Sequence, residues 1–336
     1  MSHVAYIAIG GEEKLLCFDM NPSDGALTLR DEISLGGTPG PLAIDPTRRY
    51  LYVGLRSTCQ IITFQIEPQT GQLTRLGDPV QLDTDPCYLS TDRTGRFLLA
   101  AYYRGGKVTV HPIDDAGAVG PTAVCTVETL PYAHCIQTDP TNRFAFLPHV
   151  STSNTIFQFR FDAATGQLTP NNPPQVTPEP GVGPRHYVYH PTQNILYFSN
   201  EQGNSVTAYR LDPNQGTLTP FQTLPTLPAD FTGANTCAKI KIDRAGRFLY
   251  VSNRGHDSIA GFTVDATGWL TAIGQQPTEP TPRAFTLDPS GNFLYASGQG
   301  SGNLAAYRIN QQSGQLCPLT TYTIGARPMW VMIIKN

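Results

Sequence analysis

Seven copies of a short turn motif divide the chain into units of nearly equal length. Each copy places Gly inside a polar turn, most often followed by an apolar residue and Thr, as in SDGALT, QTGQLT and ATGWLT. The glycines, spaced by 46 to 52 residues, are Gly25, Gly71, Gly117, Gly166, Gly216, Gly268 and Gly314. We expect each to supply the positive φ of a hairpin turn. A repeat of this length predicts one supersecondary unit used seven times.

A second motif recurs in six of the units. A polar turn precedes a short strand rich in aromatic and branched residues, as in DPTRRYLYVG and DPSGNFLYAS, and another apolar strand comes just before the turn. The copies begin at Asp45, Asp92, Asp139, His190, Asp243 and Asp288. A seventh inner strand, residues 328–334, ends the chain without a partner, and residues 5–9 resemble a lone second strand. Pairing of these two ends would remove the free sheet edges that a linear array leaves exposed.

These counts predict an all-β chain, a seven-bladed β-propeller closed by its N-terminal strand, as a single domain of residues 1–336. Division of 336 residues by seven gives about 48, which suits four short strands per blade. The 31 glycines and 29 prolines fit many tight turns, and prolines in every unit exclude a helical repeat. The Trp-Asp signature of WD40 propellers is absent. We expect the Pro-rich residues 171–184 to form a long loop within one blade.

Composition excludes several classes of partner. The net charge of −3 and the pI near 6.1 argue against nucleic acid or an anionic membrane as partner. No apolar run of about 18 residues predicts a membrane span, and the N-terminus does not resemble a signal peptide. Seven scattered cysteines without a Cys-x-x-Cys pair predict reduced thiols, each of them a small buried apolar side chain. We therefore expect a cytoplasmic protein that is a monomer or a weak homo-oligomer.

The predicted topology places a site before any chemistry is considered. Residues just before each innermost strand and just after each second strand must gather at one mouth of the central channel. In this charge-poor chain the two sets contain Arg56, Arg104, Arg185, Arg254, Arg283 and Arg327. Clustered guanidinium groups bind carboxylates or phosphates, although about half of these arginines are expected to be structural. The mouth therefore predicts a small anionic ligand.

Several segments resemble a known family. GPRHYVYHP (residues 183–191), EPTPRAFTLDPSG (279–291), RYLYVGLR (49–56), NEQGNSV (200–206) and RPMWVMI (327–333) are similar, in blade order, to the 6-phosphogluconolactonase-like propellers. The same superfamily contains fungal enzymes that lactonise 3-carboxymuconate, in which a His, an Arg, a Glu and a second Arg have been proposed as the active site. By position within the blades, the resemblance implies His134, Arg185, Glu201 and Arg254 as catalytic residues.

Hydrolysis of a lactone needs an activated water and a stabilised oxyanion. Either Glu201 or His134 is suited to take the water proton. A carboxylate flanked by arginines stays ionised and is a weak base, which slightly favours His134. Arg185 and Arg254 are suited to hold the oxyanion or the anionic tail of the substrate. We expect replacement of these four side chains to leave folding little changed, because they face a wet channel. Further substrate-binding candidates are Arg56, Tyr102, His186, Arg283, Gln299 and Arg327.

Other chemistry is not predicted. His186 and His190 lie on one expected strand, roughly 13 Å apart at about 3.3 Å per residue, too far to share a metal ion. We expect no catalytic metal and no cofactor, and no phosphate loop or nucleophile elbow is present. Three hypotheses stay open: hydrolysis of an anionic sugar lactone, most specifically 6-phosphogluconolactone; lactonisation of a muconate-type diacid; and a non-enzymatic scaffold.

Overall fold

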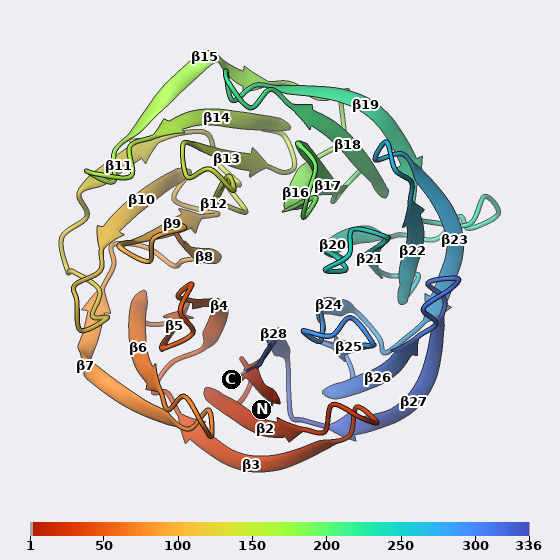
Figure 1. The fold of residues 1–336 in the computed structure, drawn as a ribbon, viewed down its shortest axis with the longest axis horizontal. Helices are drawn as coiled ribbons and strands as arrows, with labels where there is room; N and C mark the ends of the chain where they lie inside the picture. Colours follow the sequence, from red (N-terminus) through yellow and green to blue (C-terminus); the bar gives the residue numbers. More distant parts are fainter. Residues whose placement is uncertain (1–2, 336) are drawn as a thin grey trace.

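A computed structural model describes residues 3–335. Its 28 strands form seven antiparallel four-stranded sheets, arranged as blades around a central channel (Figure 1). The predicted seven-bladed β-propeller is confirmed. The expected domain of residues 1–336 includes positions 1, 2 and 336, which lie outside the described residues.

Each blade has four strands, arranged in order from the channel to the outside. The innermost strands are β4 (Pro39–Ile44), β8 (Tyr88–Thr91), β12 (Gln137–Thr138), β16 (Pro184–Tyr189), β20 (Thr236–Ile242), β24 (Pro282–Leu287) and β28 (Pro328–Lys335). The second strands are β1 (His3–Ile9), β5 (Tyr50–Leu55), β9 (Phe97–Tyr102), β13 (Phe144–His149), β17 (Ile195–Asn200), β21 (Phe248–Arg254) and β25 (Phe293–Gly298). The third strands are β2 (Lys14–Met20), β6 (Gln60–Ile66), β10 (Lys107–Pro112), β14 (Thr155–Phe161), β18 (Ser205–Leu211), β22 (Ser258–Val264) and β26 (Asn303–Ile309). The outer strands are β3 (Leu27–Ser34), β7 (Leu73–Gln81), β11 (Cys125–Glu128), β15 (Leu168–Val176), β19 (Leu218–Pro225), β23 (Leu270–Pro277) and β27 (Leu316–Thr323).

The two chain ends meet in one blade, as predicted. β1 lies between β28 and β2 and pairs antiparallel with both. Its register with β28 runs from His3 opposite Lys335 to Ile9 opposite Pro328. The closing blade therefore takes its innermost strand from the C-terminus and its three outer strands from the N-terminus (Figure 1), so the ring is closed by main-chain hydrogen bonds.

The seven motif glycines occupy the hairpins between the third and outer strands, and all have positive φ, as predicted. They also touch the preceding blade. A Cβ at Gly216 would overlap the ring of Phe144. Five of these hairpins accept a hydrogen bond from a buried tyrosine of the preceding blade: Tyr6 to Gly71, Tyr52 to Gly117, Tyr197 to Gly268, Tyr250 to Gly314 and Tyr295 to Gly25. The turn motif thus also serves blade-to-blade packing.

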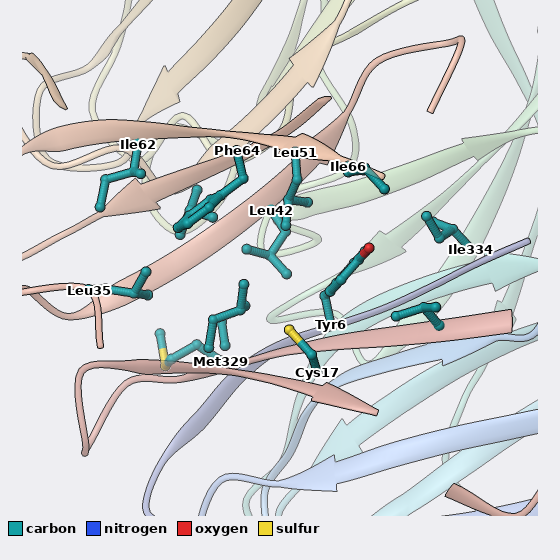
Figure 2. Packing of buried hydrophobic residues seen from close by; sticks show 14 of the residues in the cluster. Tyr6, Cys17, Leu35, Leu42, Leu51, Ile62, Phe64, Ile66, Met329 and Ile334 are labelled. Atoms are coloured by element: carbon teal, nitrogen blue, oxygen red, sulfur yellow. The ribbon is translucent and has the colours of Figure 1, made fainter. Parts of the chain in front are cut away.

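Apolar side chains fill the space between adjacent blades. Figure 2 shows one such cluster, where Tyr6 and Cys17 of the closing blade meet Leu42, Leu51 and Phe64 of the next. All five side chains are buried. Because sheet faces pack only on their neighbours, the core is a set of inter-blade layers.

Two sequence-based expectations need correction. Residues 171–176 belong to outer strand β15, so the predicted loop over residues 171–184 is confined to residues 177–183. A register shift between Phe157 and Phe159 lets the Pro-rich strand keep pairing with β14. All seven cysteines are free, but Cys317 is exposed and Cys59 is half-buried.

Among the described residues, no helix is long and apolar enough to cross a membrane. The cytoplasmic location and the monomeric or weakly oligomeric state stay predictions.

Candidate active site

Polar side chains from strand ends gather at one mouth of the channel around a basin of about 210 Å³. His134 precedes β12, Arg185 lies near the start of β16, Glu201 follows β17, and Arg254 ends β21. Innermost and second strands are antiparallel, so the start of one lies beside the end of the other. The basin is lined by Arg56, Cys87, Tyr103, Arg104, His134, Arg185, Glu201, Arg254 and Arg283.

Glu201 is held between two arginines. Its Oε2 lies 2.6 Å from Nε of Arg185, and its Oε1 lies 3.3 Å from Nη2 of Arg254. Arg254 also donates from Nη2 to the carbonyl of Cys237 at 3.0 Å. The backbone of Glu201 is fixed as well, since its N–H donates to the carbonyl of Gly183 at 2.7 Å. With both oxygens beside guanidinium groups, this carboxylate is suited to orient the two arginines.

Burial of Arg185 corrects the expectation of a wet channel around all four residues. Its relative exposure is 1% and that of His134 is 5%. Burial lowers the pKa of Arg185 to about 10, an effect that the neighbouring Glu201 carboxylate opposes. The group is still a cation at neutral pH. Because breaking a buried ion pair is costly, we now expect loss of Arg185 to reduce stability as well as activity.

His134 and His186 form a contacting pair. Nδ1 of His134 lies 3.2 Å from Nε2 of His186, so one nitrogen donates and the other accepts. Burial and then the nearby charge of Arg185 lower the pKa of both rings well below the usual 6.5. Both rings are therefore neutral near pH 7. The contact between them uses one nitrogen of each ring, so the second nitrogen can transfer a proton or form a hydrogen bond to another group.

Two further arginines differ in their partners. Arg56 forms an ion pair with Asp85, with Nε and Nη2 at 3.0 and 2.5 Å from Oδ2. Among residues 3–335 no carboxylate forms an ion pair with Arg283. Burial and the charges of Arg185 and Arg254 lower the pKa of Arg283 to about 9. Arg283 thus brings an uncompensated positive charge to the basin, the condition that favours capture of an anion.

Four predicted substrate-binding residues lie outside the basin: His186, which lines a smaller hollow beside it, and Tyr102, Gln299 and Arg327. Tyr102 is fully buried between blades, and its Oη is 2.8 Å from Oγ1 of Thr109. Side chains alternate along a strand, so the next residue, Tyr103, faces the basin instead, with its ring 5.6 Å from that of His134. Gln299 donates to Sδ of Met329 at 3.1 Å. Arg327 is exposed and does not line the basin.

Sequence reasoning missed two residues below the basin, Lys239 and Trp330, which line a smaller hollow together with His186. The available signal was Lys239 itself, a charged residue in the apolar inner strand CAKIKI.

His190 takes the place of the turn aspartate, since its Nδ1 accepts hydrogen bonds from the backbone N–H groups of Thr192 and Gln193. Within the described part of the chain, no group of His, Cys, Asp or Glu side chains is arranged to hold a metal ion.

The comparison with known families fits this geometry. A model of lactonases with a seven-bladed β-propeller matches residues 3–333. The chain belongs to this lactonase family. This lactonase is 37% identical over 336 residues to the 6-phosphogluconolactonase of Pectobacterium carotovorum, and the match covers 99% of each chain. It is also 37% identical over 335 residues to that of Yersinia pestis, covering 99% of this chain and 98% of the relative.

Among solved structures, the lactonase fold superposes on a periplasmic gluconolactonase of Pseudomonas aeruginosa with a TM-score of 0.91 and 25% identity. The match covers 100% of this chain and 99% of the other. Membership of a family of lactone hydrolases removes the scaffold hypothesis.

Proposed function

We propose that this lactonase hydrolyses 6-phosphogluconolactone to 6-phosphogluconate. The observation that carries the proposal is the basin itself, where the Glu201–Arg185–Arg254 cluster and the neutral His134 lie beside an uncompensated Arg283. Two relatives at 37% identity bear the name 6-phosphogluconolactonase. A phosphorylated lactone needs one group of cations for its carbonyl oxygen and another for its phosphate, and the basin has enough arginines for both.

The residues of the basin have different roles in the proposed reaction. Arg185 and Arg254 face the carbonyl oxygen and stabilise its negative charge as water adds to the carbonyl carbon. His134 takes the water proton. When the ring C–O bond breaks, the same proton passes to the departing ring oxygen, which becomes the hydroxyl of the product. Glu201 keeps the two guanidinium groups in place, and Arg283 with Arg104 binds the phosphate.

A second candidate substrate is the unphosphorylated gluconolactone, because a structural neighbour is a gluconolactonase. That substrate would leave Arg283 without an anionic partner. In the muconate-type reaction, the same arginines would bind the two carboxylates of a diacid. Activity measurements on one panel of substrates can distinguish these three candidate reactions.

The decisive measurement compares the hydrolysis of 6-phosphogluconolactone and gluconolactone after subtraction of the spontaneous rates. We expect kcat/KM to favour the phosphorylated lactone by at least about tenfold, because a hydrogen bond to a charged group contributes roughly 1.5–3 kcal/mol. Equal values for the two lactones would contradict the phosphate assignment. Faster turnover of a muconate-type diacid would reassign the reaction.

The role of Arg283 gives a separate prediction. Arg283→Met should raise KM for 6-phosphogluconolactone about tenfold or more and change kcat little, because the phosphate does not take part in bond cleavage. Inhibition by inorganic phosphate should weaken in parallel. Arg244→Met, the same change of charge at an exposed position near the other end of the channel, is the control. Unchanged KM and phosphate inhibition in Arg283→Met would place the phosphate elsewhere.

A further inference from the structure

Below the basin lies a second hollow, of about 20 Å³. The two cavities share Arg56, Cys87, His134, Arg185 and Arg283 as lining residues, so the smaller one continues the basin into the channel. Its volume suits about one water molecule, which needs roughly 10–15 Å³ and two to four polar partners. A sugar ring cannot enter it.

Lys239 is the unexpected residue of this hollow. It lies in the middle of β20 with a relative exposure of 4%. Its Nζ is 3.4 Å from the centroid of the Trp330 ring and 5.5 Å from that of Tyr88. No carboxylate among residues 3–335 forms an ion pair with it. A buried ammonium without an anionic partner costs stability, so packing alone gives no reason for a lysine here.

Most of the other polar side chains that line this hollow are histidines or arginines. His186 and His134 line the same hollow and contact each other at 3.2 Å. Positive charges act on the amine from Lys241 on its own strand, from Arg185 on β16 and from Arg283 on β24, and Cys135 acts in the opposite direction. Burial and these cations lower the pKa of Lys239 well below 10.5. The Nζ of Lys239 carries N–H donors, so it can donate a hydrogen bond to the oxygen of a water in the hollow.

We propose that the small hollow holds the hydrolytic water and that Lys239 orients this water towards His134. The inference rests on the proposed lactone hydrolysis. The oxygen of the held water forms the new bond to the carbonyl carbon from below, while the lactone lies in the basin above. His134 lines both cavities and is placed to take the proton. The ring C–O bond then breaks and the proton returns to the ring oxygen, so Lys239 keeps its own protons throughout.

The first test removes the amine without opening the hollow. Lys239→Met keeps most of the side-chain volume, and it should lower kcat by at least about tenfold with KM changed less than about threefold, as for a group that acts on the water and not on the substrate. Its thermal unfolding temperature should equal or exceed that of the wild type, because a buried, unpaired amine is lost. Arg244→Met is the control. Arg244 comes shortly after the same strand, is exposed and lines a different cavity at the other end of the channel. It should keep kcat within about twofold.

The second test asks which nucleophile enters the hollow. In aqueous methanol, the wild type and Lys239→Met should form the hydroxy acid and no enzymatic methyl ester, because the hollow accepts water alone. Lys239→Ala enlarges the hollow and should form methyl ester above the uncatalysed background. Wild-type kcat in a folded Lys239→Met, or methyl ester formation by the wild type, would overturn the proposal. Failure of the wild type to hydrolyse any lactone would instead refute the proposed function.

Discussion

Replacing Arg185 by methionine should lower kcat/KM for the best lactone by at least about 10², the usual cost of removing one oxyanion donor. The guanidinium is buried, is a cation at neutral pH and lies 2.6 Å from Glu201. Its loss removes the charge that faces the developing oxyanion and also one of the two ion-pair partners of Glu201. The measurement is steady-state kinetics beside thermal unfolding. Arg185→Lys should recover only part of the rate, because an ammonium lacks the planar fork that can meet a carboxylate and a substrate oxygen together.

Stability must be separated from catalysis in this experiment. Breaking a buried ion pair on one side costs about 3–5 kcal/mol, less where the remaining charge reaches solvent. The Glu201 side chain is 15% exposed and keeps Arg254 as a partner, so a cost below that range is expected. The double variant Arg185→Met with Glu201→Gln removes both charges and should regain stability but not activity. A folded double variant with near-normal turnover would show that the arginine acts only as a structural partner of the glutamate.

Deletion of residues 1–10 should prevent formation of a stable folded monomer. The deletion removes β1, whose side chains from Val4 to Ile9 have 0% exposure, and leaves β28 and β2 as two unpaired edges. Burial of Val4, Tyr6, Ile7 and Ile9 at roughly 1.5–3 kcal/mol each is comparable with the whole stability of a typical domain, about 5–15 kcal/mol. Size-exclusion chromatography and thermal unfolding measure the effect. A truncated chain that melts like the full one would contradict the closure.

A permuted chain distinguishes loss of the strand from loss of the N-terminus. β28 and β1 are antiparallel, and Lys335 lies opposite His3. A short hairpin turn can therefore join them. A chain that begins after the β1–β2 turn and carries β1 behind β28 should fold as well as the native order. If it does not, chain order matters beyond strand pairing.

The repeats alone determined the ring of this protein. Each unit carries its own turn chemistry and buries its sheet faces only against its neighbours, so seven local patterns add up to one topology. Counting unpaired strands at the two ends was enough to predict the pairing of β1 with β28. The same topology predicted that His134, Arg185, Glu201 and Arg254 would meet at one mouth, because strand direction decides at which end of a blade a residue lies.

Tertiary structure decided which way each side chain points and how deeply it is buried. Tyr102, the last residue of β9, is buried, whereas the next residue, Tyr103, lies in the basin, and counting repeats cannot distinguish two adjacent residues. The burial of Arg185 and the place of Lys239 over the Trp330 ring arise where β16, β20 and β28 converge on the channel. Each blade alone leaves that side open to solvent, so the depth and charge of the site are properties of the closed ring.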